Sequence, residues 1–134
     1  MPIIRCKSQK SRSLSEHYLE LTVSDDKYSR SAGETMIRWI QRLDNEFPTL
    51  NIFALTSVDR LVLMSSNDWT ADWSVIIIGY EGHYHVEYLL PENESPWHNA
   101  YVIGNTKDFE EAIEMTKLGM KKSRAWTELN IHPS

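Results

Sequence analysis

Two runs rich in apolar residues flank a two-residue turn near the middle of the chain, and they constrain the fold more than any other feature. Residues 73–80 and 83–90 alternate in character on either side of Glu81-Gly82. Glycine supplies the positive φ that a two-residue hairpin loop needs, and this loop length sets Tyr80 opposite His83. The pattern therefore predicts an antiparallel hairpin with a defined register.

The predicted register divides the hairpin into two faces, because side chains alternate across a strand. One face is apolar apart from Gly79 and is expected to face the core; it carries Trp73, Val75, Ile77, Tyr84, Val86, Tyr88 and Leu90. The other face is amphipathic; it carries Ser74, Ile76, Ile78, Tyr80, His83, His85, Glu87 and Leu89. We expect this second face to be partly solvated or covered by a partner.

The remaining segments predict an α+β fold. Apolar residues at helical spacing predict one helix over residues 31–47 and a second helix that Thr106 caps. Alternation predicts a strand over residues 18–23, and short apolar runs predict strands over residues 50–56, 60–65 and 101–103. Short connections between consecutive strands favour a meander. The expected architecture is a two-layer sandwich, in which an antiparallel meander sheet of about five to six strands carries two helices on one face.

The charges are spread unevenly along the chain. Residues 1–15 contain four basic residues and no acid, and they are expected to form a flexible basic arm before a single domain at 16–134. The whole chain has 14 Lys and Arg against 19 Asp and Glu, so the domain has 10 against 19, or −9. A body of this charge argues against a nucleic-acid partner, because phosphate contacts need basic side chains.

The location expected for the protein is the cytoplasm. The longest strongly apolar run, residues 75–78, is far shorter than the ~20 residues of a membrane span, so no membrane partner is expected. The first residues lack the apolar region of a secretory signal. A single cysteine, Cys6, cannot form an intramolecular disulfide, which fits a reducing compartment.

Residues 61–106 contain no Lys or Arg, although they hold six acids and seven of the eleven Trp and Tyr residues. Acids that steer encounter and aromatic anchors together favour binding of a basic protein surface. The leading hypothesis is a small non-enzymatic binding protein, for example a toxin-neutralising immunity protein or a regulatory protein. Its expected contact residues are Asp68, Trp69, Asp72, Glu81, Glu87, Glu92, Glu94 and Trp97. The alternative is that the aromatic residues simply fill the core.

A second hypothesis places an enzyme or small-ligand site on the amphipathic face. The residues it uses are Tyr80, His83, His85 and Glu87. Catalysis is the less favoured function, because no nucleophile elbow or phosphate loop accompanies these residues. The register places no third zinc ligand opposite the two histidines, so neither a metal nor another cofactor is expected. The same face could form a homodimer through Ile76, Ile78, Tyr80 and Leu89.

Overall fold

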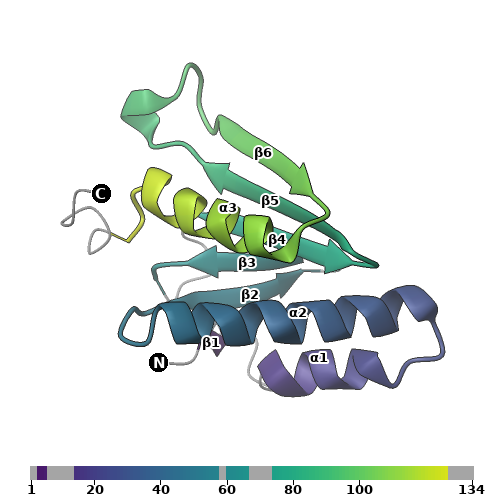
Figure 1. Ribbon diagram of the computed structural model, residues 1–134. Helices are drawn as coiled ribbons and strands as arrows, with labels where there is room; N and C mark the ends of the chain where they lie inside the picture. Colours follow the sequence, from purple (N-terminus) through teal and green to yellow (C-terminus); the bar gives the residue numbers. More distant parts are fainter. Residues whose placement is uncertain (1–2, 6–13, 58–59, 67–73, 127–134) are drawn as a thin grey trace.

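A computed structural model describes residues 3–5, 14–57, 60–66 and 74–126. Figure 1 shows one twisted sheet with helices packed along it. The sheet has six strands in the order of the sequence. Their bounds are β1 Ile4–Arg5, β2 Phe53–Ser57, β3 Arg60–Met64, β4 Val75–Tyr80, β5 His83–Leu89 and β6 Tyr101–Thr106. β2 to β6 form the antiparallel meander expected from the sequence, and β1 adds to β2 in parallel.

Three helices accompany the sheet: α1 Leu14–Thr22, α2 Lys27–Glu46 and α3 Phe109–Lys122. A one-turn 3-10 helix, η1, spans Glu92–Glu94. Trp39 of α2 and Phe109 of α3 both contact the ring of Tyr84, at centroid distances of 5.6 and 5.7 Å. The α+β class predicted from the sequence is therefore confirmed, and α2 and α3 both reach the core face of the central hairpin (Figure 1).

The hairpin has the predicted register, with Tyr80 opposite His83, Ile78 opposite His85 and Ile76 opposite Glu87. Both turn residues have positive φ, 46° at Glu81 and 76° at Gly82, as a two-residue loop between twisted strands requires. The face predicted to be apolar is the core face, since Val75 and Ile77 are fully buried.

The prediction of a strand over residues 18–23 is wrong, because this segment belongs to helix α1. Leu14 and Tyr18 are buried and Leu21 packs against the same core, which is the i, i+4, i+7 spacing of a helix. The apparent alternation came from Leu19 and Val23, which are 55% and 79% exposed. Exposed apolar residues in this segment therefore produced the alternation that is typical of a strand.

The predicted helix over 31–47 exists, but it begins four residues earlier, at Lys27. The carboxylate of Asp26 accepts hydrogen bonds from the backbone N–H and the hydroxyl of Ser29, and so caps α2. The second helix has a similar cap. Its N-cap is Asp108, whose carboxylate accepts from the N–H of Glu110, so the prediction of Thr106 as the cap is wrong.

Within the range predicted as an arm, residues 3–5 are in contact with the domain. Ile3 is buried, and its N–H donates to a carboxylate oxygen of Asp44 at 2.6 Å. Ile4 pairs with Phe53 in β2. At the other end, Trp126 is buried in the same core and its indole N–H donates to the carbonyl of Asn51 at 2.8 Å.

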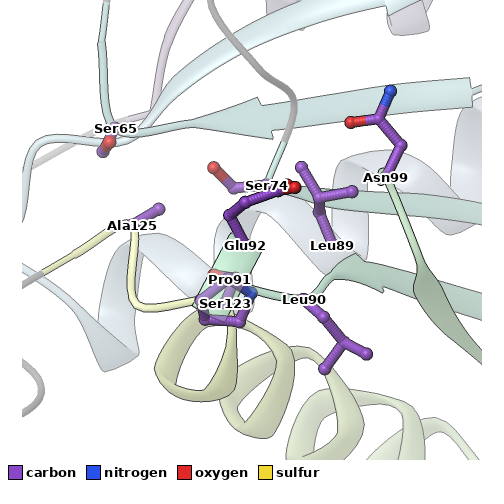
Figure 2. Close-up of a pocket in the computed structure, with 9 residues that line it drawn as sticks. All are labelled: Ser65, Ser74, Leu89, Leu90, Pro91, Glu92, Asn99, Ser123 and Ala125. Carbon is purple, nitrogen blue, oxygen red and sulfur yellow. The ribbon is translucent and has the colours of Figure 1, made fainter. Parts of the chain in front are cut away.

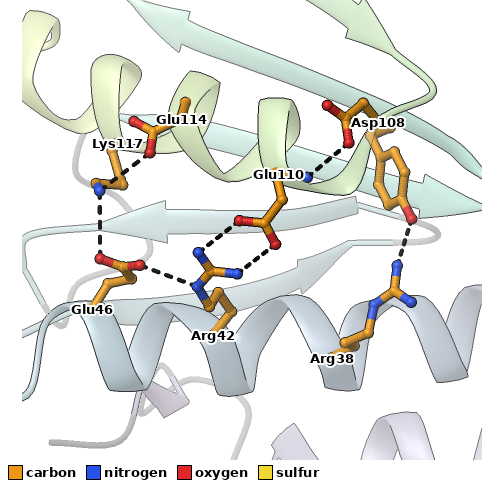
Figure 3. Close-up of polar contacts among 8 residues, drawn as sticks. Arg38, Arg42, Glu46, Asp108, Glu110, Glu114 and Lys117 are labelled. Atoms are coloured by element: carbon orange, nitrogen blue, oxygen red, sulfur yellow. Dashed lines mark hydrogen bonds and ion pairs between the residues drawn. The ribbon is translucent and has the colours of Figure 1, made fainter.

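Ion pairs connect α2 to α3 above the sheet (Figure 3). The guanidinium of Arg42 makes two hydrogen bonds to Glu110, at 2.7 and 2.8 Å, and a third to Glu46 at 3.1 Å. Lys117 joins Glu46 from the α3 side. Hydrogen bonds from Arg42 hold the pKa of both carboxyl groups below its ordinary value of 4.5.

Gly33 makes the first testable prediction. A Cβ at this position would lie 2.7 Å from the carbonyl oxygen of Tyr18 and 2.9 Å from the Cβ of Leu21. Alanine in a helix is normally favoured over glycine by about 1 kcal/mol. Here we expect Gly33→Ala to destabilise by about 1–3 kcal/mol, because α1 must move away from α2. Urea unfolding measures the change, with the exposed Glu34→Ala as the control. A stabilised Gly33→Ala protein would contradict this packing.

The Arg42 ion pairs predict a pH dependence. A carboxyl group whose pKa is lowered by folding stabilises the protein above its unfolded pKa, and this stabilisation is lost as pH falls through the folded value. Thermal melting should therefore drop as pH falls below about 4.5. In Arg42→Gln the drop should be shallower, whereas the exposed Arg60→Gln should follow the wild type. Equal slopes for all three proteins would contradict the assignment.

Candidate functional site

The amphipathic face of the hairpin contains a hydrogen-bonded network centred on His85. Its Nε2 lies 2.9 Å from a carboxylate oxygen of Glu87, and its Nδ1 lies 2.8 Å from Oδ1 of Asn105 in β6. The pairing of His85 with Asn105 in adjacent strands brings these groups together.

This network occupies both ring nitrogens of His85 and leaves Glu87 only 8% exposed. A ligand or a metal could reach His85 only by displacing Glu87 or Asn105. Asn105 was missed in the sequence, since only the register of β6 against β5 reveals it. Among the residues described, no group of three or more His, Cys, Asp or Glu side chains could hold a metal ion.

Tyr80 and His83 lie apart from this network, at the turn end of the hairpin. The ring of Tyr80 lies between Tyr28 and His83, at centroid distances of 4.7 and 5.9 Å. Tyr80 and His83 border an open cavity of about 360 Å³ with Tyr84, Asn105, Thr106 and Lys107. The four residues predicted as a ligand site are therefore divided, with two lining a cavity and two engaged with each other.

The connection between β5 and β6, residues 90–100, is the second candidate site, and we call it the 90–100 loop. Pro91 leads into η1, and the N–H of Leu90 donates to the carbonyl of Ala100 at 3.0 Å, which closes the base of the loop. Two contacts hold it: Glu92 lies within hydrogen-bonding distance of His98, and Glu94 forms an ion pair with Arg124 beyond the end of α3. These contacts give the loop a defined shape.

Trp97 projects from this braced loop. Its side chain is 72% exposed, although the indole is among the largest apolar groups in a protein. The carboxylate of Glu92 is also largely exposed beside it in the same loop. Three of the residues predicted to bind a partner, Glu92, Glu94 and Trp97, therefore lie together.

The other predicted contact residues do not join this group. Glu81 lies in the hairpin turn at the opposite end of β5, which is roughly 20 Å away for a strand of this length. Glu87 is buried against His85. Asp68, Trp69 and Asp72 lie outside the described residues.

A cavity of about 280 Å³ lies beside the 90–100 loop (Figure 2). Five parts of the chain line it: the ends of β3 and β5, the residue before β4, the loop itself, and the segment after α3. The lining residues are Ser65, Ser74, Leu89, Leu90, Pro91, Glu92, Asn99, Ser123 and Ala125. Sequence reasoning missed this cavity because its walls come from segments far apart in the chain. One wall is the 90–100 loop, whose prolines and asparagines are typical of a loop in the sequence.

Exposed apolar side chains gather next to the loop, on the last strand and helix. Tyr101, Val102 and Ile103 of β6 and Leu118 of α3 are all more than a third exposed. In contrast, Ile76 on the amphipathic face is buried in a small cluster with Val62 and Met64. One exposed apolar surface of the described residues thus lies at the β6 edge of the sheet.

Comparison with known proteins gave no matching family model, curated protein or solved structure. Within the described part of the chain, no helix has the length and apolar character needed to cross a membrane.

The His85 network makes a prediction for stability. In His85→Ala the carboxylate of Glu87 loses its partner while buried, so we expect a loss of about 1–3 kcal/mol. Adding Glu87→Leu should recover part of that loss, giving a coupling energy of about 0.5–3 kcal/mol in a double-mutant cycle. The exposed pair of His98 and Glu92 is the matched control, and His98→Ala should cost less than about 0.5 kcal/mol. Additive effects at His85 and Glu87 would contradict the network.

Proposed function

We propose that the protein functions by binding another protein, and that the 90–100 loop contacts a partner with a basic surface. The observation that carries the proposal is Trp97, which is 72% exposed on a loop that is closed at its base and joined to Arg124 through Glu94. Tryptophan is the residue type most enriched among binding hot spots. An exposed indole gains most from burial against a partner.

The bracing of the loop supports this proposal through entropy. A mobile loop would lose conformational freedom on binding, at a cost of about 0.5–1.5 kcal/mol for each side chain immobilised. Here η1, the Leu90–Ala100 hydrogen bond and the ion pair of Glu94 with Arg124 already restrict the loop. More of the energy of burying Trp97 is then available for affinity.

The formal charge of the loop and its adjoining strands supports a basic partner. No Lys or Arg occurs between Arg60 and Lys107, so the loop and both adjoining strands contribute only negative formal charge. The carboxylate of Glu92 is largely exposed and can steer a cationic surface toward Trp97. Glu94 has a different part, since its contact with Arg124 fixes the loop to the end of α3.

The same proposal places the protein in a reducing compartment such as the cytoplasm, which the single cysteine supports. The second function predicted from the sequence, ligand binding or catalysis by the His83, His85 and Glu87 face, has less support. Glu87 is buried, and both nitrogens of His85 are hydrogen-bonded within the chain.

A paired affinity capture tests the proposal. Wild-type protein and Trp97→Ala are immobilised equally and exposed to lysate of the source organism, with Leu19→Ala as a control for another exposed apolar residue. We expect one or more proteins with basic surfaces to be retained by the wild type and by Leu19→Ala and to be lost from Trp97→Ala. Identical capture by all three baits would overturn the assignment of the loop.

Kinetics with the captured partner separate the two contributions. Glu92→Lys should slow association at low salt, and the effect should shrink at 1 M salt, where the Debye length is about 3 Å. Trp97→Ala should instead speed dissociation, by roughly tenfold or more, because a desolvated anchor acts at short range. An association rate unaffected by Glu92→Lys at low salt would contradict steering.

A further inference from the structure

Among the described residues, strand β6 forms one edge of the sheet, since it pairs with β5 on one side and is last in the strand order. Residues 101–106 include no Lys, Arg, Asp, Glu or Pro, which are the residues that usually protect an edge strand from pairing. Ile103 is 49% exposed on this strand, and Val102 is 39% exposed. An uncharged, apolar edge of this kind is a template for another strand.

The hydrogen-bond pattern shows which backbone groups face outward. The N–H of Leu90 donates to the carbonyl of Ala100, so this pair is hydrogen-bonded across the ladder. Hydrogen-bonded pairs alternate along antiparallel strands, and Val102 and Gly104 therefore point their backbone groups toward β5. Ile103 and Asn105 point theirs to the open side of β6.

Helix α3 presents a matching surface above this edge. Met115 and Leu118 border a cavity of about 140 Å³ with Val102, Ile103 and Gly104 of β6. A Cβ at Gly104 would overlap the Cε of Met115, so the helix lies close to this strand. Leu118 is 50% exposed. Glu111 lies four residues before Met115, and Lys122 lies four residues after Leu118, so both are on the same face of the helix, and both are exposed.

These positions are symmetric about one point. Along the sequence, Glu111 and Lys122 are equally far from the midpoint between Met115 and Leu118. Met115 and Leu118 border residues 102–104 of β6, and the middle residue of these three is Ile103. A two-fold axis through Ile103 would place Glu111 of one copy opposite Lys122 of the other. It would also place Met115 opposite Leu118.

We propose that β6 pairs antiparallel with β6 of a second copy of this chain, so that the two sheets join and the two α3 helices lie side by side. Ile103 then exchanges both backbone hydrogen bonds with its counterpart, and Val102 faces Gly104 of the second copy. Glu111 and Lys122 form two symmetric ion pairs. The opposite charges favour this antiparallel arrangement over a parallel one, in which like charges would meet.

The spacing is compatible with this arrangement. Three strand spacings separate the two β5 strands of a joined sheet, which is about 14 Å. Helices that pack directly lie 8–10 Å apart. Because Gly119 of α3 packs against Tyr88 of β5, the two helices lie about as far apart as the two β5 strands. The long side chains of Met115 and Leu118, and of Glu111 and Lys122, extend into the space between them.

The dimer also extends the proposed function without depending on it. Antiparallel pairing of β6 places the two 90–100 loops at opposite ends of the joined strands. Each dimer then presents two Trp97 side chains, which permits bivalent binding to a partner with repeated sites.

Sedimentation velocity of the purified full chain, over a concentration series, tests the proposal. We expect a reversible dimer. Glu111→Lys and Lys122→Glu should each weaken it, because each replaces two ion pairs by two like-charge contacts, and a three- to tenfold rise in Kd is the expected scale. A 1:1 mixture of these two variants should restore dimerisation, since every contact across the heterodimer is again attractive. Glu34→Lys carries the same charge change on α2 and should dimerise like the wild type.

Ile103→Lys provides a second variant and should raise Kd more than tenfold while the circular dichroism spectrum stays unchanged. A wild-type chain that remains monomeric at 100 µM would overturn the proposal. So would a dimer that Ile103→Lys leaves intact, or one in which the mixture is no tighter than the single variants. These experiments use this chain alone, so their failure is distinguishable from a failure to find the partner of the 90–100 loop.

Discussion

Trp39 is the residue on which the arrangement of both helices and the sheet depends. Its indole is fully buried, and its N–H donates to the hydroxyl of Thr116 in α3 at 3.2 Å. That hydroxyl in turn donates to the carbonyl of Ala112. The ring packs edge-on against Tyr84 and directly over Gly79, where a Cβ would lie only 3.2 Å from it. One side chain of α2 thereby fixes the position of α3 and the height of both helices above the hairpin.

The placement of α3 determines which surfaces remain for function. Gly119 lets the helix approach Tyr88 of β5, since a Cβ there would lie 3.2 Å from the tyrosine Cβ. With α3 held close to β5, the apolar residues of β6 are left partly exposed. The same helix ends beside the 90–100 loop, where Arg124 holds Glu94. Both proposed surfaces therefore follow from the packing of one helix.

Some features were predictable from the sequence because their determinants are local. The hairpin register followed from the two-residue turn, and the positions of α2 and α3 followed from apolar spacing. The identity of α1 was not predictable by alternation, because its true core residues, Leu14 and Tyr18, are mixed with exposed apolar ones. The N-cap of α3 was predicted at the wrong residue for a related reason, since Thr106 and Asp108 are both polar residues that can cap a helix.

The candidate site shows the same division between local and long-range information. Trp97, Glu92 and Glu94 could be identified together because they are neighbours in one loop. The burial of Glu87 against His85, which removes it from the contact surface, could not be predicted from composition. It depends on the packing of this face and on Asn105 from another strand. The symmetry of Glu111 and Lys122 about Met115 and Leu118 becomes meaningful only once α3 is placed over an open edge.

The central claim is that the 90–100 loop is a contact surface for another protein, and site-specific photo-crosslinking in the source organism tests it most directly. A benzoylphenylalanine is incorporated in place of Trp97 and, in a separate strain, in place of Leu19, which is also more than half exposed. The account predicts a discrete covalent adduct with another protein from position 97 and none of that mass from position 19. The same adduct pattern from both positions, or no adduct from position 97 above background, would contradict it.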